Sequence, residues 1–308
     1  MTTLSNKIDF AVIMCVNNAN PNGDPLNGNR PRTTFDGLGE ISDVAIKRKI
    51  RNRLMEMGKS IFVQSDDNRL DDYRSLKSRA DAKLKGVDPK DDKKYRIAAC
   101  EEWFDVRAFG QVFAYKGKNK KGKGKDEGED KEGNRGESKE GGKGSGVSIG
   151  IRGPVSVHPA FSVAKVENRI IPTQITKSVN LEGDDGKMAS DRIGMKHRVD
   201  HGVYVFYGSM NTQLATKTGF SDDDAKAIKE VIKALFRNDA SSARPEGSME
   251  VHKVYWWEHN NLNGQYSSAK VHRLIDVKPN KDDPNSIEDY TITLNELPGL
   301  KCEVIEGE

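Results

Sequence analysis

The sequence predicts an α+β fold, in which helices interrupt a set of strands without regular alternation. Three stretches carry this prediction. Residues 8–16 and 201–210 are apolar runs of strand length, and residues 221–239 place apolar side chains at helical spacing. The chain has 308 residues, enough for one large domain or two small ones.

Composition gives a weak indication of partner and compartment. The chain carries 50 Lys and Arg against 47 Asp and Glu, a net charge of +3, so charge favours an anionic partner only where it clusters. Cys15, Cys100 and Cys302 are isolated and lack the spacing of a zinc site or a disulfide framework. A reducing, cytoplasmic setting is expected, and no apolar run has the length of a membrane span.

The first elements are expected to be a strand, a long loop and a helix. Residues 8–16 place apolar side chains on both faces, which is typical of a largely buried strand. Residues 17–37 then collect six asparagines and three prolines, which favour turns. A helix is predicted over 42–57, because Ser42 can cap its start and Gly58 can end it.

The middle of the chain is more polar. Residues 66–100 are expected to be helical in parts, with a break at 88–91, and residues 103–115 to form a strand pair or a strand with a bulge near Gly110. Residues 116–146 hold ten Gly and nine Lys but no aromatic residue. Such a segment buries too little apolar surface to offset its ordering entropy, so a flexible loop is predicted.

The C-terminal half is expected to complete the sheet. Its best helix is 221–239, where Ser221 caps a first turn that holds three Asp. The remaining predicted elements are strands at 147–157, 163–171, 201–210, 254–259 and 270–277, and a projecting hairpin or arm at 172–200.

Apolar and basic side chains fall on opposite sides of the predicted helix 42–57. The apolar side has Ile46, Ile50, Leu54 and Met57, and the basic side has Lys47, Arg48 and Arg51. Basic groups at this spacing can follow the phosphates of a nucleic-acid strand, with the apolar side docked on the sheet. An ordinary solvated face with an Asp43–Lys47 pair is the other interpretation. The six lysines between 116 and 125 leave a similar choice, between an electrostatic arm and a solubilising loop.

No set of residues assembles an active site in the sequence. His197 and His201 are four apart, but HExxH is absent and the surrounding run is typical of a strand, where joint metal ligation is difficult. Asp24 could act as an acid, yet an Asp after Asn-Gly is more often a turn former. Asp105, isolated in an apolar run, is expected to pair with Arg107 or to cap a turn. We therefore expect no catalytic function, no metal and no cofactor.

Six blocks, taken in order, resemble a known family. They are "NPNGDP" at 20–25, "GEISDVAIKRKIR" at 39–51, "FDVRAFG" at 104–110, "GPVSVHPAF" at 153–161, "RIGMKHRVDHGVY" at 192–204 and "DASSAR" at 239–244. Together they resemble the backbone subunit of type I CRISPR Cascade complexes, most closely that of the type I-C system. The resemblance covers nearly the whole chain except 116–146.

This resemblance implies both a fold and a function. The fold is a single palm domain over 1–308 with a modified RNA-recognition-motif (ferredoxin-like) core of the RAMP superfamily, a helical insertion at about 59–102 and a thumb-like β-hairpin at about 171–201. Copies of the family polymerise along the guide RNA (crRNA) as a helical filament. Each thumb kinks one nucleotide out, and the other bases stay available to pair with target DNA. Further partners implied are the large, small and repeat-end-capping Cascade subunits, and a recruited helicase–nuclease that performs cleavage.

Carried over by position, the resemblance assigns RNA-binding residues to three segments. These are Asn20, Asn22, Arg30 and Arg32 in the loop, Ser42, Lys47, Arg48 and Arg51 at the helix, and Gln174, Thr176, Met188 and Met195 in the thumb, the two methionines as apolar wedges. Lys118, Lys120, Lys121 and Lys123 lie outside the family's motifs, and we list them as a hypothesis for target-DNA binding.

Two enzymatic alternatives stay open at this stage. One is an endoribonuclease of the same superfamily that acts on CRISPR repeat RNA and uses His197 or His201. The other is a metal-dependent target-RNA nuclease that uses an acid of the first loop, Asp24 or Asp36. Cleavage of RNA by the purified protein would favour either of them over a binding subunit.

Overall fold

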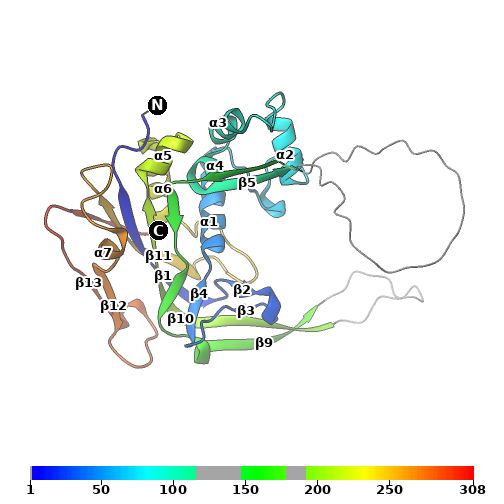
Figure 1. Ribbon diagram of the computed structural model, residues 1–308. Helices are drawn as coiled ribbons and strands as arrows, with labels where there is room; N and C mark the ends of the chain where they lie inside the picture. Colours follow the sequence, from blue (N-terminus) through cyan, green and yellow to red (C-terminus); the bar gives the residue numbers. More distant parts are fainter. Residues whose placement is uncertain (1, 116–146, 178–191) are drawn as a thin grey trace, which may run out of the picture.

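The fold is built around one antiparallel sheet, seen in a computed structural model that describes residues 2–115, 147–177 and 192–308 (Figure 1). The strand order is β14-β11-β1-β10-β8-β4, and β7 and β9 also pair with β10. At its centre β1 (Ile8–Ala19) runs antiparallel to β10 (Arg192–Met210) and to β11 (Met249–Glu258). The predicted α+β class is confirmed, whereas the finer RNA-recognition-motif topology stays a prediction.

The remaining elements surround this sheet. The other described strands are β2 (Gly23–Asp24), β3 (Arg30–Pro31), β4 (Leu38–Ile41), β5 (Gly110–Tyr115), β6 (Val147–Arg152), β7 (Val155–Val157), β8 (Ala160–Lys165), β9 (Ile170–Lys177), β12 (Ile275–Pro279), β13 (Tyr290–Leu294) and β14 (Cys302–Glu306). The described helices are α1 (Asp43–Glu56), α2 (Leu76–Lys83), α3 (Asp92–Glu102), α4 (Phe104–Phe109), α5 (Thr212–Thr218), α6 (Asp222–Lys233) and α7 (Ser268–His272). None of these helices is long and apolar enough to cross a membrane.

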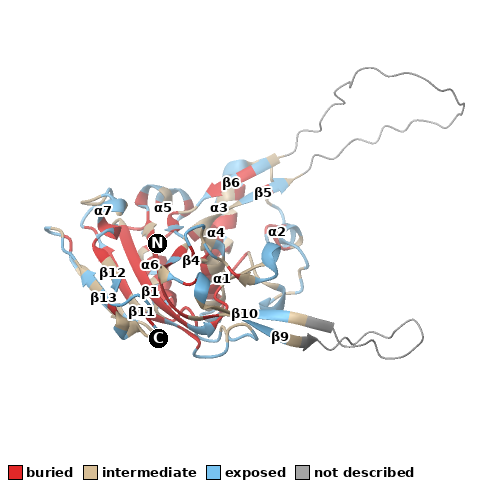
Figure 2. Cartoon of the chain, turned by 90° about the horizontal axis from the view of Figure 1, so that it is seen from below, coloured by how far each residue is buried: buried red, intermediate tan, exposed pale blue. Residues whose placement is uncertain are grey.

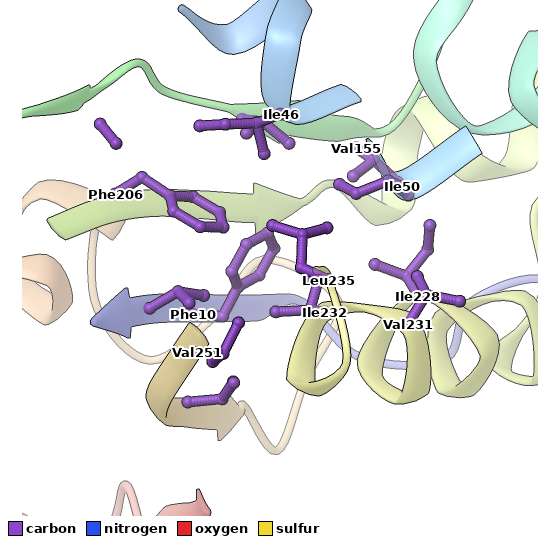
Figure 3. Packing of buried hydrophobic residues seen from close by; sticks show 14 of the residues in the cluster. Phe10, Ile46, Ile50, Val155, Phe206, Ile228, Val231, Ile232, Leu235 and Val251 are labelled. Carbon is purple, nitrogen blue, oxygen red and sulfur yellow. The ribbon is translucent and has the colours of Figure 1, made fainter. Parts of the chain in front are cut away.

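Both faces of the central sheet are covered, and Figure 2 shows the buried residues concentrated in β1 and its neighbours. On one face Phe10 and Phe206 pack against α1 and α6, whose apolar side chains interdigitate (Figure 3). On the other face Ala11, Ile13 and Cys15 pack against α7 and the β12–β13 pair. This explains why residues 8–16 are apolar at odd and even positions alike.

The two longest helices begin where the sequence predicts. The Ser42 hydroxyl accepts a hydrogen bond from the Ala45 amide at 3.3 Å and so caps α1. Ser221 and Asp224 form a reciprocal capping box at the start of α6. The helix α6 ends at Lys233 rather than 239, and the apolar residues Leu235 and Phe236 are buried from the turns that follow it.

The strand pair predicted over 103–115 is wrong in its first half, which is the helix α4. Phe104 and Ala108 of this helix pack in the main core, whereas Val106 packs in a separate cluster with Phe62 and Phe113. A helix between two clusters is apolar on several sides and so lacks the one-sided helical pattern. Gly110 has a φ of 80°, in the left-handed region, where the chain turns from α4 into β5.

The prediction that 270–277 closes the main sheet is also wrong. This stretch forms α7 and the start of β12, and β12 pairs with β13 in a two-stranded sheet of their own. The edge of the main sheet beside β11 is taken by β14. The sequence alone did not indicate β14 as a strand.

Two antiparallel ladders lead toward the segments that the structure does not describe. The β9–β10 ladder runs from Ile170↔Val199 to Lys177↔Arg192, within the predicted arm. The β5–β6 ladder ends at Tyr115↔Val147. Lys118, Lys120, Lys121, Lys123 and Met188 lie outside the described residues. The bounds of the helical insertion and the thumb stay predictions.

Candidate nucleic-acid interface

The loop between β1 and α1 is held in shape by its own asparagines. Asn20 is 3% exposed, and its Nδ2 donates to the Asn29 carbonyl at 2.8 Å. The Asn22 Oδ1 accepts from the Ser42 amide at 2.9 Å and ties the loop to the start of α1. Asn20, Asn22 and Ser42 thus brace the loop internally, and direct contact of their side chains with a ligand stays a prediction.

The charged residues of the loop lie around a short hairpin formed by β2 and β3. Asp24 lies opposite Arg30 in the register of this hairpin. Its Oδ1 accepts from the Leu26 amide at 3.2 Å, which is the role of a turn former. Arg32 Nη2 lies 3.5 Å from Asp24 Oδ1. Both arginines are half-buried, so each keeps part of its guanidinium at the surface.

The three cations on the basic side of α1 all contact other groups of the same chain, whereas a row of cations free to bind phosphate was expected. Arg51 is 11% exposed, and its Nε donates to Asp105 Oδ2 at 2.8 Å. Arg48 donates to the Val63 carbonyl at 2.6 Å, and Lys47 pairs with Asp43 at 3.0 Å. The stripe is covered because residues that follow α1 fold back over it.

Asp105 is the anchor of that cover, and its predicted pairing with Arg107 is wrong. Its two carboxylate oxygens accept from the Phe62 amide at 2.7 Å and the Val63 amide at 3.1 Å, in addition to Arg51. Arg107 instead pairs with Asp224 of α6 at 2.9 Å. The predicted apolar side is correct for Ile46, Ile50 and Leu54, whereas Met57 is 45% exposed.

A groove of about 610 Å³ opens beside α1, between the first loop and residues 238–244. Two cations converge there on one carboxylate. Lys49 is 5% exposed and pairs with Asp239, and Arg244 Nε lies 3.1 Å from the same Asp239 oxygen. The other lining residues are Pro21, Asn22, Gly23, Ala45, Arg48, Asn52, Glu56, Ser65, Asp67, Asn68, Asn238, Ala240 and Ser241.

Lys49 and Arg244 are the site residues that the sequence reasoning missed. Lys49 falls between the apolar and basic sides of the helix, so helical spacing did not mark it. Arg244 ends the "DASSAR" block, for whose residues the resemblance implies no role. The resemblance of this block to the family was the one feature of the sequence that pointed to Arg244.

The predicted arm begins next to the same groove. Arg198 Nε donates to Asn18 Oδ1 at 2.9 Å, and Lys196 donates to the Ser242 carbonyl. Met195 is 51% exposed and pairs across the ladder with Gln174, which is also exposed. Thr176 lies opposite Ile193 in the same ladder. Lys196 and Arg198 thus tie the start of the arm to residues 242 and 18, and sequence reasoning had assigned them no role.

The two histidines of β10 differ in burial, since His197 is half-buried and His201 is buried. His201 is buried, its Nδ1 lies 2.7 Å from Asn17 Oδ1, and burial lowers the pKa of both His201 and His197. Within residues 2–115, 147–177 and 192–308, no three His, Cys, Asp or Glu side chains are grouped so as to hold a metal ion. The described cysteines are free thiols.

The match to known proteins spans nearly all of this architecture. The family model of CRISPR-associated protein Cas7 matches residues 6–295, from just before β1 to just after β13. The chain belongs to the Cas7 family. A curated "CRISPR-associated protein Cas7" from Haloferax volcanii is 26% identical over 303 residues, which cover 96% of this chain and 83% of that relative.

Solved structures with some likeness to this Cas7 chain come from CRISPR assemblies. A chain of a CRISPR RNA-guided surveillance complex in a pre-nicking state has a TM-score of 0.41 and 15% identity, covering 82% of this chain and 78% of its own. A chain of another CRISPR RNA-guided surveillance complex has a TM-score of 0.38 and 15% identity, covering 82% and 68%.

In this Cas7 chain, several of the quoted sequence blocks meet in space. Residues of "NPNGDP", "GEISDVAIKRKIR" and "DASSAR" all line the groove. A fourth block, "RIGMKHRVDHGVY", comes next to it, because Lys196 donates to the carbonyl of Ser242, which follows the lining residue Ser241. Blocks that are far apart in sequence thus surround one charged groove.

Proposed function

We propose that this Cas7 chain is the crRNA-binding backbone subunit of a type I-C Cascade complex. In this proposal it polymerises along the spacer as a filament and presents the guide for pairing with target DNA. The observation that supports it most is the groove, where buried Lys49 and half-buried Arg244 converge beside the first loop and the base of the arm. A phosphate that entered there could replace the Asp239 carboxylate as partner of both cations.

The chemistry of the groove suits a ligand that is recognised by its backbone. Its described lining consists of Lys, Arg, Asn, Ser, acids and small residues, and none of these residues is aromatic. A subunit that accepts any spacer sequence needs contacts to phosphate and sugar rather than to base edges. The N-terminal turn of α1 also borders the groove through Ala45, and helix N-termini favour phosphate.

The proposed subunit acts by binding alone, and cleavage belongs to a recruited helicase–nuclease. Its other partners are further copies of itself, target DNA and the remaining Cascade subunits. Asp24, Asp36, His197 and His201 have no catalytic role in this proposal, because Asp24 serves a turn and His201 is buried against Asn17.

Native mass spectrometry of the purified assembly tests the function directly. We expect several copies of the chain to travel with one intact RNA of defined length. A monomer without RNA would contradict the binding function. RNA that is shortened on incubation by wild-type protein, but not by His197→Ala or His201→Ala variants, would favour the endoribonuclease.

RNA affinity is expected to fall as pH rises from about 7 to about 9, because Lys49 loses its charge in this range. Burial lowers the pKa of Lys49 to about 8, even though Asp239 opposes the shift. An unfolded lysine keeps its proton to about pH 10.4, so the contribution of Lys49 to the free energy of unfolding rises over the same range, and its deprotonation does not promote unfolding. Fluorescence anisotropy with labelled guide RNA measures the effect. Lys49→Arg should remove the pH dependence, and an equal dependence in that variant would contradict the assignment.

Replacing residues 116–146 by Asn-Gly is expected to leave folding and RNA loading intact and to weaken target-DNA binding at moderate salt. Tyr115 and Val147 are paired, so Asn-Gly gives a two-residue hairpin connection. The six lysines between 116 and 125 would be lost as phosphate contacts. Electrophoretic mobility shifts over a salt series measure DNA affinity. A full-length variant with these lysines changed to Gln separates charge from length, and an unchanged salt slope in both variants would reduce the segment to a spacer.

A further inference from the structure

One aromatic side chain of the described structure stands entirely in solvent. Phe35 is 105% exposed, which is unusual for a large apolar residue. It lies in a turn that is held firmly. The Thr34 amide donates to the Leu38 carbonyl at 2.7 Å, and the Gly37 amide donates to the Thr34 carbonyl at 3.1 Å.

The turn is also fixed to the sheet, so the exposure of Phe35 is built into the fold. The Gly37 carbonyl accepts from the Val166 amide at 3.0 Å, directly after β8. Gly37 has a φ of 82°, a conformation that favours glycine. A side chain presented on a rigid turn loses little further entropy when it binds.

An apolar socket of matching size lies elsewhere on the chain, between α2 and β5. Its volume is about 180 Å³. Its apolar and aromatic lining is Phe62, Leu76, Ala80, Val112, Phe113, Ala114 and Tyr115. An apolar cavity of roughly 150 Å³ is large enough to bind benzene, so this socket can take one phenyl ring. Leu76 and Val112 at the socket are 40% and 63% exposed, so it is open to an incoming group.

The neighbouring segment of the same chain has nothing that could fill this socket. Residues 116–146 follow Tyr115 directly, yet they consist of Lys, Arg, Asp, Glu, Asn, Ser and Gly alone. An apolar group that fills the socket would therefore come from another part of the chain or from another molecule. Exposure favours the Phe35 turn, because Phe35 is the most exposed large apolar side chain of the described residues, whereas Lys77 at the socket already pairs with Asp81.

We infer that Phe35 of one copy inserts into the socket between α2 and β5 of the next copy. The inference rests on the proposed function, since it names the contact that joins neighbouring copies on the RNA. A protrusion and a socket on different surfaces make a head-to-tail contact, which propagates as a filament. One phenyl ring buries far less than the roughly 1,200 Å² of a stable interface, so the contact acts mainly between copies that the RNA aligns.

Cysteine pairing between two separately purified variants tests this contact. In a Cys302→Ser background, Phe35→Cys protein is mixed with Val112→Cys protein, with and without guide RNA, under mild oxidation. We expect a disulfide-linked dimer that RNA enhances, and none from Leu262→Cys with Val112→Cys, since Leu262 is a 56% exposed residue of another loop. Equal dimer from both mixtures, or none from either, would overturn the inference. Dimer from Met188→Cys in place of Phe35→Cys would assign the socket to the arm.

A binding measurement separates protein docking from base stacking. Phe35→Ser should bind an RNA that fits one copy as wild type does, and bind an RNA that fits several copies about tenfold more weakly. An equal loss on both RNAs would show that Phe35 stacks on a base. If wild type binds neither RNA, the proposed function fails, whereas the RNA-free cysteine mixture still decides whether the contact exists.

Discussion

Replacing Asp105 by Ala is expected to lower the free energy of unfolding by about 3–5 kcal/mol, because it leaves a buried charge without a partner. Asp105 is 1% exposed and accepts from Arg51 and from the amides of Phe62 and Val63. All three donors would lose their acceptor within a closed site. Urea denaturation followed by circular dichroism measures the change. Asp105→Asn keeps the shape and one acceptor, so its loss should be smaller.

A matched exposed acid provides the control for this prediction. Asp81 pairs with Lys77 on the surface of α2, and its side chain is 47% exposed. Asp81→Ala should leave the denaturation midpoint unchanged, because exposed ion pairs contribute little. A loss of less than about 1 kcal/mol in Asp105→Ala would mean that the segment after α1 is held by other contacts.

Replacing Lys49 and Arg244 by Gln, together with Asp239→Asn, is expected to abolish co-purification with RNA. Changing Asp239 as well avoids leaving its carboxylate unpaired, so the triple variant should still fold. Each cation that contacts a single-stranded phosphate contributes about 0.7 to the slope of log affinity against log salt. The slope should therefore fall by about 1.4 where residual binding can be measured.

The control removes two lysines that pair with acids at the β14 edge of the main sheet. Lys229 pairs with Glu303 at 2.5 Å and Lys253 with Glu306 at 3.4 Å, both beside β14. Lys229→Gln with Lys253→Gln makes the chain more negative by two charges without touching the groove. Equal RNA loss in this control would trace binding to net charge, and full RNA loading in the triple variant would remove the groove from the proposed function.

Local signals predicted the elements whose determinants are local. The start of α1 depends on Ser42 and the start of α6 on Ser221 and Asp224, all within three residues of the amides that they cap. The burial of β1 follows from its apolar run, which Asp9 alone interrupts between Ile8 and Val16. In contrast, α4 is apolar toward two clusters, so its helical period was hidden.

The candidate site was harder to predict, because its partners are distant in sequence. Lys49 and Asp239 are 190 residues apart, and Arg51 and Asp105 are 54 apart. Helical spacing correctly separated the apolar side of α1 from Arg51, but it could not indicate that a later segment folds over the basic side. The same spacing gave Lys49 no role, although it is the lysine of α1 that the fold directs into the groove.

The length of β10 limits which insertions the two strands of the predicted arm can accept. This strand of 19 residues, roughly 60 Å if fully extended, pairs with β1 at one end and with β9 at the other, and the two ladders meet at Val199. β10 therefore runs without a break from the main sheet into the predicted arm. Side chains alternate along a strand, so one residue added to each arm strand turns every more distal side chain to the opposite face. Two residues added to each strand lengthen the arm and keep every face, so arm length can drift in steps of two without disturbing the core.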